Sequence, residues 1–211
     1  MNPSNPLRSI TPTVDADVLF ALARSHAPMT GYVIEKATGR AHAGVLKVLA
    51  RLVDEGIVER EKVGQANRYR LNRAHLLAGP LGEAAESMAR LEEQITSLGA
   101  QMNPAPVAVL LFGSFARRDG DSDSDVDLFV VRPENVEADD AGWLRSRSIL
   151  AGAVEAASGN PCQLMEATPT ELAEGIARQE DLIQSLRADA VCLFGSPPVE
   201  IRTPRLAEAI Q

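Results

Sequence analysis

Apolar residues recur at helical spacing in the first quarter of the chain and then give way to short alternating runs. Helices are predicted over residues 14–26, 30–38 and 41–55, and strands over residues 57–63 and 67–71. Thr30 favours a helix N-cap, while Gly39 and Gly56 favour the ends of the second and third helices. The pattern therefore predicts three helices followed by a β-hairpin.

A heptad-like seam of apolar residues runs through residues 80–102. Its members alternate spacings of three and four: Leu81, Ala84, Met88, Leu91, Ile95, Leu98 and Met102. Because charged residues lie outside the seam, this period favours a long helix that pairs with a second copy of the chain in a homodimer. The alternative is an ordinary amphipathic helix that packs on its own domain. Residues 103–106 contain two prolines, which end the helix and mark a domain boundary.

Beyond residue 104, apolar runs of strand length alternate with helical patterns. Strands are predicted over residues 107–112, 126–131, 161–167 and 190–194, with a helix over residues 170–187. The expected fold of this half is therefore α/β (α+β), a mixed β-sheet flanked by helices.

The first half resembles winged helix-turn-helix transcriptional regulators, most clearly at Leu-Ala-Arg-Leu-Val-Asp-Glu-Gly-Ile-Val, residues 49–58, which leads into the hairpin or wing. The resemblance implies that DNA is bound by the recognition helix, here the third helix, and by the wing. The residues it points to are Arg40, His42, Lys47 and Arg51 on or beside that helix, and Lys62, Gln65, Asn67 and Arg68 in the wing.

Charge divides the chain in the same way. Residues 1–75 hold 11 Lys and Arg against 7 Asp and Glu, a net charge of +4, whereas the whole chain carries −8. A basic domain suits the phosphate backbone of double-stranded DNA. Winged helices also dock proteins, so a protein-binding role for this domain remains an alternative.

A glycine turn and two carboxylates carry the chemistry of the second half. Gly113 and Ser114 end one predicted strand where a helix would begin, so their N–H groups could hold phosphates, with Arg117 and Arg118 neutralising charge. Asp125 and Asp127 occupy alternate positions at the next strand, so both carboxylates emerge on one face, about 7 Å apart. Such a pair suits Mg²⁺ or Mn²⁺ together with nucleotide phosphates.

The stretch GSFARRDGDSDSDVDL, residues 113–128, resembles the signature of DNA polymerase β-like nucleotidyltransferases, in particular their minimal branch. The resemblance implies Mg²⁺-dependent transfer of a nucleoside monophosphate from a nucleoside triphosphate to an acceptor. It assigns the triphosphate to Gly113 and Ser114 and the metal to Asp125 and Asp127. The alternative is a solvated acidic loop; the spacing does not fit a calcium-binding loop.

The same resemblance predicts a third carboxylate in the strand at residues 161–167, but that position holds Gln163. Glu166 is the nearest catalytic substitute, although strand alternation turns it to the opposite face unless a bulge redirects it. Two functions follow: a nucleotidyltransferase with an unknown acceptor, or a non-catalytic regulator, antitoxin-like, whose second domain binds nucleotide or a toxin-like partner protein.

The expected organisation is a disordered tail (1–12), a winged helix (13–75), a linker and dimerisation helix (76–103), a nucleotidyltransferase domain (104–200) and a C-terminal tail (201–211). Cys162 and Cys192 are expected as buried thiols rather than a disulfide, which fits a reducing cytoplasm. The sequence shows no signal peptide and no apolar stretch of membrane-spanning length, so a cytoplasmic protein is expected.

Overall fold

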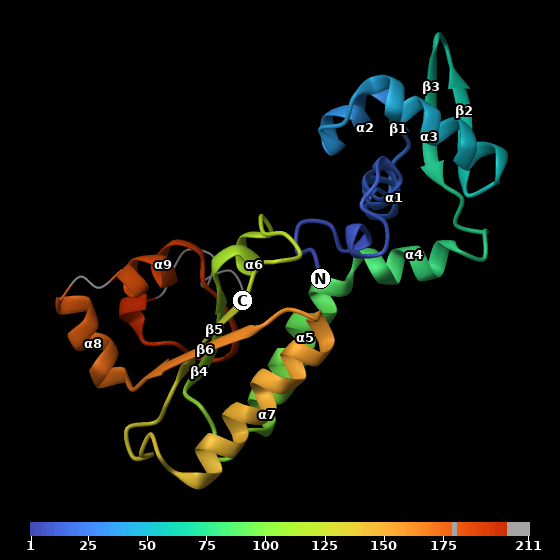
Figure 1. Cartoon of the computed structure of the whole chain (residues 1–211). Helices are drawn as coiled ribbons and strands as arrows, with labels where there is room; N and C mark the ends of the chain where they lie inside the picture. Colours follow the sequence, from blue (N-terminus) through green and yellow to red (C-terminus); the bar gives the residue numbers. More distant parts are fainter. Residues whose placement is uncertain (179–180, 202–211) are drawn as a thin grey trace. The chain divides into compact units, whose positions relative to one another are not determined.

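The computed structural model describes residues 1–178 and 181–201 (Figure 1). The chain forms two compact units, one comprising residues 4–88 with Asn2, the other residue 89 onward with Met1 and Pro3. The segment expected as a separate linker helix, residues 76–103, is therefore shared between the two units. The expected C-terminal tail lies outside the described residues apart from Ile201.

The first unit is a winged helix. Its elements are η1 (Pro6–Ser9), α1 (Val14–Arg24), β1 (Met29–Thr30), α2 (Gly31–Thr38), α3 (His42–Asp54), β2 (Val58–Val63), β3 (Ala66–Leu71) and α4 (Ala78–Ala85). The predicted helices and hairpin are confirmed, and the Thr30 hydroxyl caps α2 by accepting the Val33 N–H. Strand β1 is absent from the elements predicted from sequence. It pairs with β3 over only two residues, which is too short for a recognisable strand pattern.

The winged helix has its own apolar core. Fully buried residues from α1, α2 and α3 meet there: Val18, Leu22, Ile34, Val45, Leu49 and Leu52. The spacing of three or four between these residues in α1 and in α3 explains why the sequence pattern located these two helices. The same packing leaves one side of α3 and most of the wing exposed.

The N-terminal residues differ from the expected disordered tail. Leu7 is 3% exposed, and Asn5 caps η1 by accepting the Leu7 N–H. The Asn5 side chain also donates to Asp17 of α1 at 3.0 Å. Polar and proline-rich composition indicated disorder, but these buried contacts fix the segment against α1.

The second unit is built on a mixed four-stranded sheet in the order β6-β5-β4-β7 (Figure 1). The strands are β4 (Ala108–Phe112), β5 (Val126–Val131), β6 (Cys162–Ala167) and β7 (Val191–Gly195). β6 runs parallel to β5, while β4 is antiparallel to both β5 and β7. The strand predictions and the mixed sheet are confirmed.

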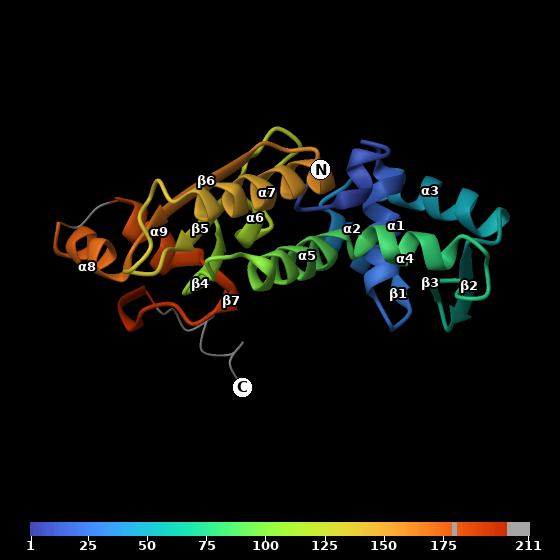
Figure 2. The same cartoon turned by 90° about the horizontal axis from the view of Figure 1, so that it is seen from below.

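Helices cover both faces of this sheet. They are α5 (Ser87–Gln101), α6 (Gly113–Arg117), α7 (Ala141–Ser158), α8 (Pro169–Ala177) and α9 (Asp181–Asp189). Leu110 and Phe129 share a core with α8 and α9, whereas Val109 lies against α5 on the other face. The segment predicted as one helix over residues 170–187 forms two helices, α8 and α9. Figure 2 shows α8 and α9 apart from α5 and α7.

The apolar seam is also divided between two helices, because α4 ends at Ala85 and α5 begins at Ser87. Ile95 is 0% exposed and Met102 is 6% exposed. A Cβ at Gly99 would lie 3.0 Å from Phe194 of β7, so α5 packs closely on the sheet. The packing of α5 therefore corresponds to the amphipathic alternative, and the homodimer stays a prediction.

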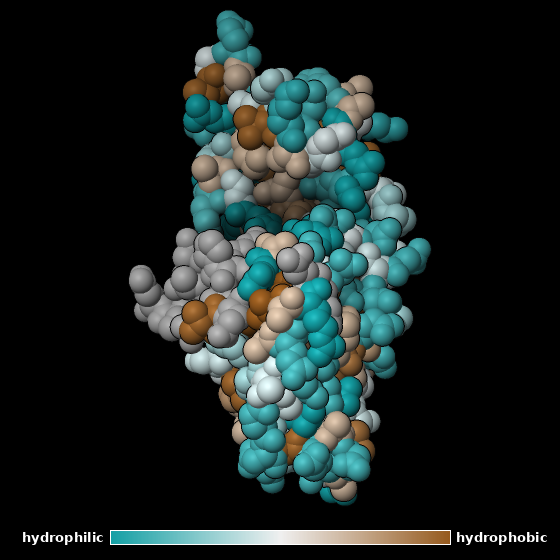
Figure 3. Space-filling view, turned by 90° about the vertical axis from the view of Figure 1, so that its left-hand side faces the viewer, coloured by the Kyte–Doolittle hydropathy of each residue, from teal (hydrophilic) through white to brown (hydrophobic). Residues whose placement is uncertain are grey.

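The surface of the second unit is mainly hydrophilic on the face shown in Figure 3, where hydrophobic residues occur singly or in small groups.

Cys162 and Cys192 are half-buried and form no disulfide, and burial raises the pKa of the Cys162 thiol to about 12. Among the described residues, no helix combines the length and apolar character needed to cross a bilayer.

Candidate nucleotide site and DNA-binding surface

The candidate nucleotide site begins where β4 turns into the short helix α6. Gly113 has φ +71°, a conformation that favours glycine. A Cβ at this position would lie 2.3 Å from Oδ2 of Asp127. Because only glycine leaves room, Asp127 packs directly on the turn that the sequence assigned to phosphate.

Asp125 and Asp127 lie as expected at the start of β5. Asp127 pairs in register with Phe112, the last residue of β4, and Asp125 precedes the strand by one residue. Burial raises the pKa of the Asp127 carboxyl, and the negative charges of Asp125 and Asp189 raise it further. The pair supplies two oxygen ligands of the kind that Mg²⁺ prefers.

The loop between α6 and β5 folds back over Ser114. A Cβ at Gly120 would lie 2.9 Å from the Ser114 hydroxyl oxygen and 2.8 Å from that of Ser124. Asp121 organises this loop, because its Oδ1 accepts the Asp123 N–H and the Ser124 hydroxyl, each at 3.0 Å. The carboxylate of Asp121 thus shapes the loop.

Both candidate arginines are engaged with carboxylates. Arg117 donates from Nε to Asp119 at 2.9 Å and also binds Asp189. Arg118 donates to Glu92 of α5 at 2.6 Å. Their guanidinium groups would have to leave these partners, or share them, to contact a phosphate.

Asp189 is a site residue that sequence reasoning missed. It closes α9, its side chain is 7% exposed, and its Oδ1 accepts the Gly113 N–H at 3.2 Å. No motif marks it, because it lies 62 positions after Asp127 in sequence and reaches the turn only through the packing of α9 on α6. Its proximity could be found only from tertiary structure.

An amide occupies the strand position at which the resemblance predicts a third carboxylate. Gln163 stands in register with Asp127 on the parallel neighbour β6, and its Nε2 donates to Asp125 Oδ2 at 3.5 Å. An amide can coordinate a cation weakly but cannot accept a proton. Within residues 1–178 and 181–201, no group of three His, Cys, Asp or Glu side chains has a geometry suited to a metal ion.

Glu166, the proposed catalytic substitute, lies on the opposite face of the sheet. Its carboxylate accepts the Trp143 Nε1–H of α7 at 2.6 Å and lies 3.1 Å from Arg147 and 3.6 Å from Arg132. Strand alternation without a redirecting bulge explains this outcome. The expectation that Glu166 joins Asp125 and Asp127 is therefore wrong.

The winged helix presents part of the expected DNA-binding set to solvent. Lys47 lies on the exposed side of α3, and Lys62, Gln65, Asn67 and Arg68 are exposed on the wing. The side chain of His42 is 51% exposed and lies 2.8 Å from Glu35. Glu61 stands across from Arg68 in the hairpin, which lowers the local positive charge.

Arg40 and Arg51 are instead held by acids of the same domain. Arg51 binds Asp15 and lies 2.8 Å from Glu55. Arg40 donates to the buried Asp17 at 2.6 Å, and Asp17 also binds Arg8 at 2.6 Å. Burial raises the pKa of Asp17, but hydrogen bonds from the two arginines and Asn5 outweigh it and lower the pKa below its ordinary value.

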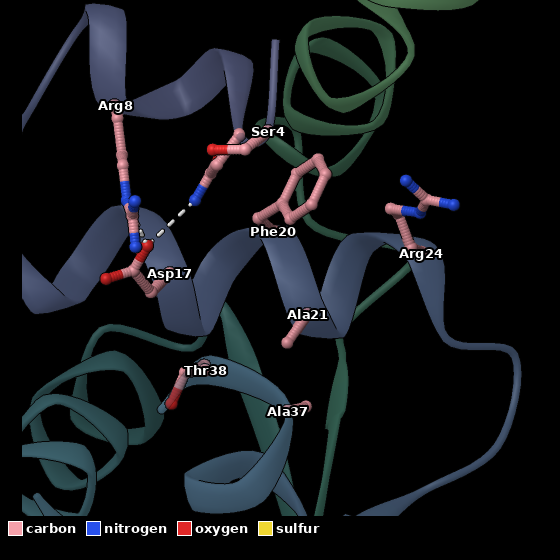
Figure 4. Close-up of a pocket in the computed structure, with 9 residues that line it drawn as sticks. Ser4, Arg8, Asp17, Phe20, Ala21, Arg24, Ala37 and Thr38 are labelled. Atoms are coloured by element: carbon pink, nitrogen blue, oxygen red, sulfur yellow. Dashed lines mark hydrogen bonds and ion pairs between the residues drawn. The ribbon is translucent and has the colours of Figure 1, made fainter. Parts of the chain in front are cut away.

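Figure 4 shows Arg8 and Asp17 pointing toward one another at one end of a pocket of about 350 Å³. Phe20 and Arg24 line the other end, with the Arg24 guanidinium 5.3 Å from the centre of the Phe20 ring. Asp17 therefore joins the N-terminal segment, α1 and the residue that leads into α3. Arg40 and Arg51 thus form ion pairs within this domain, while their side chains stay 39% and 49% exposed.

Comparisons with known proteins match the two halves separately. Residues 13–74 match the family model described as "Sugar-specific transcriptional regulator TrmB". Residues 93–189 match the family model described as "Polymerase beta, Nucleotidyltransferase". A search of curated proteins gave no match.

Among solved structures, part of the chain is similar to a protein described as "Crystal structure of the toxin-antitoxin with AMP-PNP". Sequence identity is 19%, and the match covers 56% of this chain and 83% of that chain, with a TM-score of 0.37. A TM-score this low does not establish a common fold.

Proposed function

We propose that this protein is a DNA-binding regulator that binds a nucleoside triphosphate with Mg²⁺. The proposal rests on the match of residues 13–74 to a TrmB-type regulator model and of residues 93–189 to a polymerase β-type nucleotidyltransferase model. The winged helix binds double-stranded DNA through α3 and the wing. The second domain binds the nucleotide at the turn between β4 and α6.

The contact between Gly113 and Asp127 carries the nucleotide half of the proposal. It places the turn within van der Waals reach of the Asp127 carboxylate, and Asp125 adds a second carboxylate. In the proposal Asp125 and Asp127 hold the divalent cation, and Gly113, Ser114, Arg117 and Arg118 bind the phosphates. The cation would neutralise phosphate charge and the repulsion between the two carboxylates.

Binding without turnover is the function that this geometry supports best. A transferase of this type needs a group that takes the acceptor's proton, and Gln163 cannot do so. Glu166 is held by Trp143, Arg132 and Arg147 on the other face of the sheet. The domain then acts as a nucleotide sensor for the DNA-binding half.

Transfer of a nucleoside monophosphate is the second candidate. It is favoured by the pair Asp125 and Asp127, since two carboxylates can position a metal-bound triphosphate for in-line attack. Under this candidate the acceptor hydroxyl attacks the α-phosphate, its proton passes to an oxygen of the nucleotide's own phosphates, and pyrophosphate leaves. Gln163→Asp then raises the rate because it supplies a carboxylate beside Asp125 that can take this proton.

Incubation with labelled nucleoside triphosphates separates the two candidates. The full chain is incubated with each triphosphate and Mg²⁺ or Mn²⁺, alone and with cell extract, beside Gln163→Asp and Asp127→Asn variants. Recovery of intact bound nucleotide, lost in Asp127→Asn, supports the sensor. Covalent label on an acceptor that increases in Gln163→Asp and disappears in Asp127→Asn supports the transferase.

A further inference from the structure

Asp189 occupies the same donors that the proposed function assigns to the triphosphate. Its Oδ1 accepts the Gly113 N–H at 3.2 Å, and its Oδ2 binds the Arg117 guanidinium. A carboxylate and a phosphate compete for such donors because both are anions that accept charge-assisted hydrogen bonds.

The placement of Asp189 is unfavourable for a carboxylate with a purely structural role. It stands at the C-terminal end of α9, where the carbonyl dipoles repel negative charge. Its side chain is only 7% exposed, so water contributes little to its stabilisation. The donors that bind this carboxylate, Gly113 and Arg117, are those of the candidate phosphate site.

We infer that Asp189 is an internal anion that occupies the Gly113 N–H and the Arg117 guanidinium in the nucleotide-free protein and is displaced from them by the triphosphate. The inference rests on the proposed function, which places the phosphates at this turn. Rotation of one side chain at the end of α9 would release both donors. Asp189 is thus a positioning residue that sets the nucleotide affinity through Arg117 and Gly113.

Asp189→Asn tests this inference in the full chain. The amide keeps the size of the side chain and can still accept one N–H, but it no longer binds Arg117 as an ion pair. We expect the affinity for Mg²⁺-ATP and for inorganic tripolyphosphate to rise about tenfold. The reason is that the phosphates no longer have to displace a charged carboxylate from the Arg117 guanidinium. We expect thermal stability to fall, because Arg117 loses a partner.

The opposite signs of these two effects separate a positioning role from a structural one. A carboxylate that only anchors α9 predicts lower stability with equal or weaker nucleotide binding. Asp119→Asn is the matched control, because Asp119 also binds Arg117 at 2.9 Å but is 57% exposed, so that solvent already weakens this pair. The nucleotide affinity of this variant should rise much less than that of Asp189→Asn. Arg117→Ala in the Asp189→Asn background should remove the gain.

The outcomes also separate this inference from the proposed function. If parent binding requires Asp127 and Asp189→Asn binds no tighter, the proposed site stands and the inference fails. If Asp189→Asn binds tripolyphosphate more tightly while Asp127→Asn leaves Mg²⁺-ATP binding unchanged, the inference stands and the metal site fails. An absence of binding in both the parent and Asp189→Asn overturns both.

Discussion

At the scale of single residues, Asp127 is a source of electrostatic repulsion at the candidate site. Burial, Asp125 and Asp189 all raise the pKa of its carboxyl, so the folded protein disfavours the charged form. The resulting destabilisation is present above the folded-state pKa and disappears as the pH falls below the ordinary value of 3.8, where the carboxyl is protonated in both states.

Asp127→Asn should therefore raise the thermal unfolding temperature at neutral pH, although it removes a site residue. The gain should shrink as the pH is lowered toward the ordinary pKa, because the parent carboxyl is then neutral as well. Thermal unfolding across this pH range checks the prediction, with the exposed Asp139→Asn as control. A lower unfolding temperature for Asp127→Asn at neutral pH would contradict it.

The half-buried carboxylate of Glu166 lies beside two guanidinium groups, those of Arg132 and Arg147. The side chain of Arg132 is 9% exposed and lies beside this carboxylate. Glu166→Gln would remove one of the two carboxylates beside Arg132 and leave Glu171 at 3.5 Å as its countercharge, at a cost of about 1–3 kcal/mol in the free energy of unfolding. Chemical denaturation measures this loss, and the Mg²⁺-nucleotide affinity of the folded variant, measured without denaturant, should not change. Loss of nucleotide binding with unchanged stability would return Glu166 to the candidate site.

At the scale of elements, local patterns located most helices and strands, whereas contacts between elements escaped prediction. Thr30 caps the N-terminus of α2 and Gly39 caps its C-terminus. Both ends could be predicted because capping is encoded within a few residues. The seam of α5 has the spacing of a coiled coil, but the spacing does not specify whether a second chain or its own sheet covers it. In the structure, Ile95 of this seam is buried within its own chain.

The same limit applies to the candidate site. Gly113, Asp125 and Asp127 lie within 15 consecutive residues, so their chemistry could be predicted from sequence. Asp189 reaches the turn from a helix much later in the chain, and nothing around it in sequence signals a partner. Arg40 and Arg51 were assigned to DNA by their positions, yet their acidic partners come from α1 and the end of α3.

Asp17 ties the N-terminal segment to the elements of the winged helix. Its pKa lies below the ordinary 3.8, so its ion pairs with Arg8 and Arg40 stabilise the fold above that pH and are lost as the pH falls through the lowered value. Asp17→Asn should cost about 1–3 kcal/mol at neutral pH, because two charge-assisted hydrogen bonds are weakened.

Chemical denaturation of the parent and Asp17→Asn at neutral and acidic pH checks this prediction. The difference in the free energy of unfolding should diminish toward low pH, where Asp17 is protonated in the parent. Asp54→Asn, an exposed residue at the end of α3, is the control. Equal stability of Asp17→Asn and the parent at neutral pH would show that the N-terminal segment is not held through this carboxylate.

At the scale of the whole molecule, a basic domain and an acidic domain share one chain. Residues 1–75 carry a net charge of +4, within a chain whose total is −8. This asymmetry favours duplex binding by the first domain alone, since the second repels the phosphate backbone.

Lys47→Ala on α3 and Arg68→Ala on the wing should each weaken duplex binding and reduce the slope of log affinity against log salt by about 1 for a lost phosphate contact. Arg51→Ala is the matched control, because Arg51 is bound by Asp15 and Glu55, and it should change the slope little. Fluorescence anisotropy over a range of salt measures all three. Binding insensitive to Lys47 and Arg68 would indicate that the winged helix docks protein.

Calorimetric titration of Mg²⁺-nucleotide into the full chain and into an Asp125→Asn, Asp127→Asn double variant tests the central claim most directly. The account predicts saturable, Mg²⁺-dependent binding to the parent and its loss in the double variant, while thermal unfolding shows that the variant stays folded. Equal affinity of the parent and the folded double variant would contradict a nucleotide site at Gly113, Asp125 and Asp127.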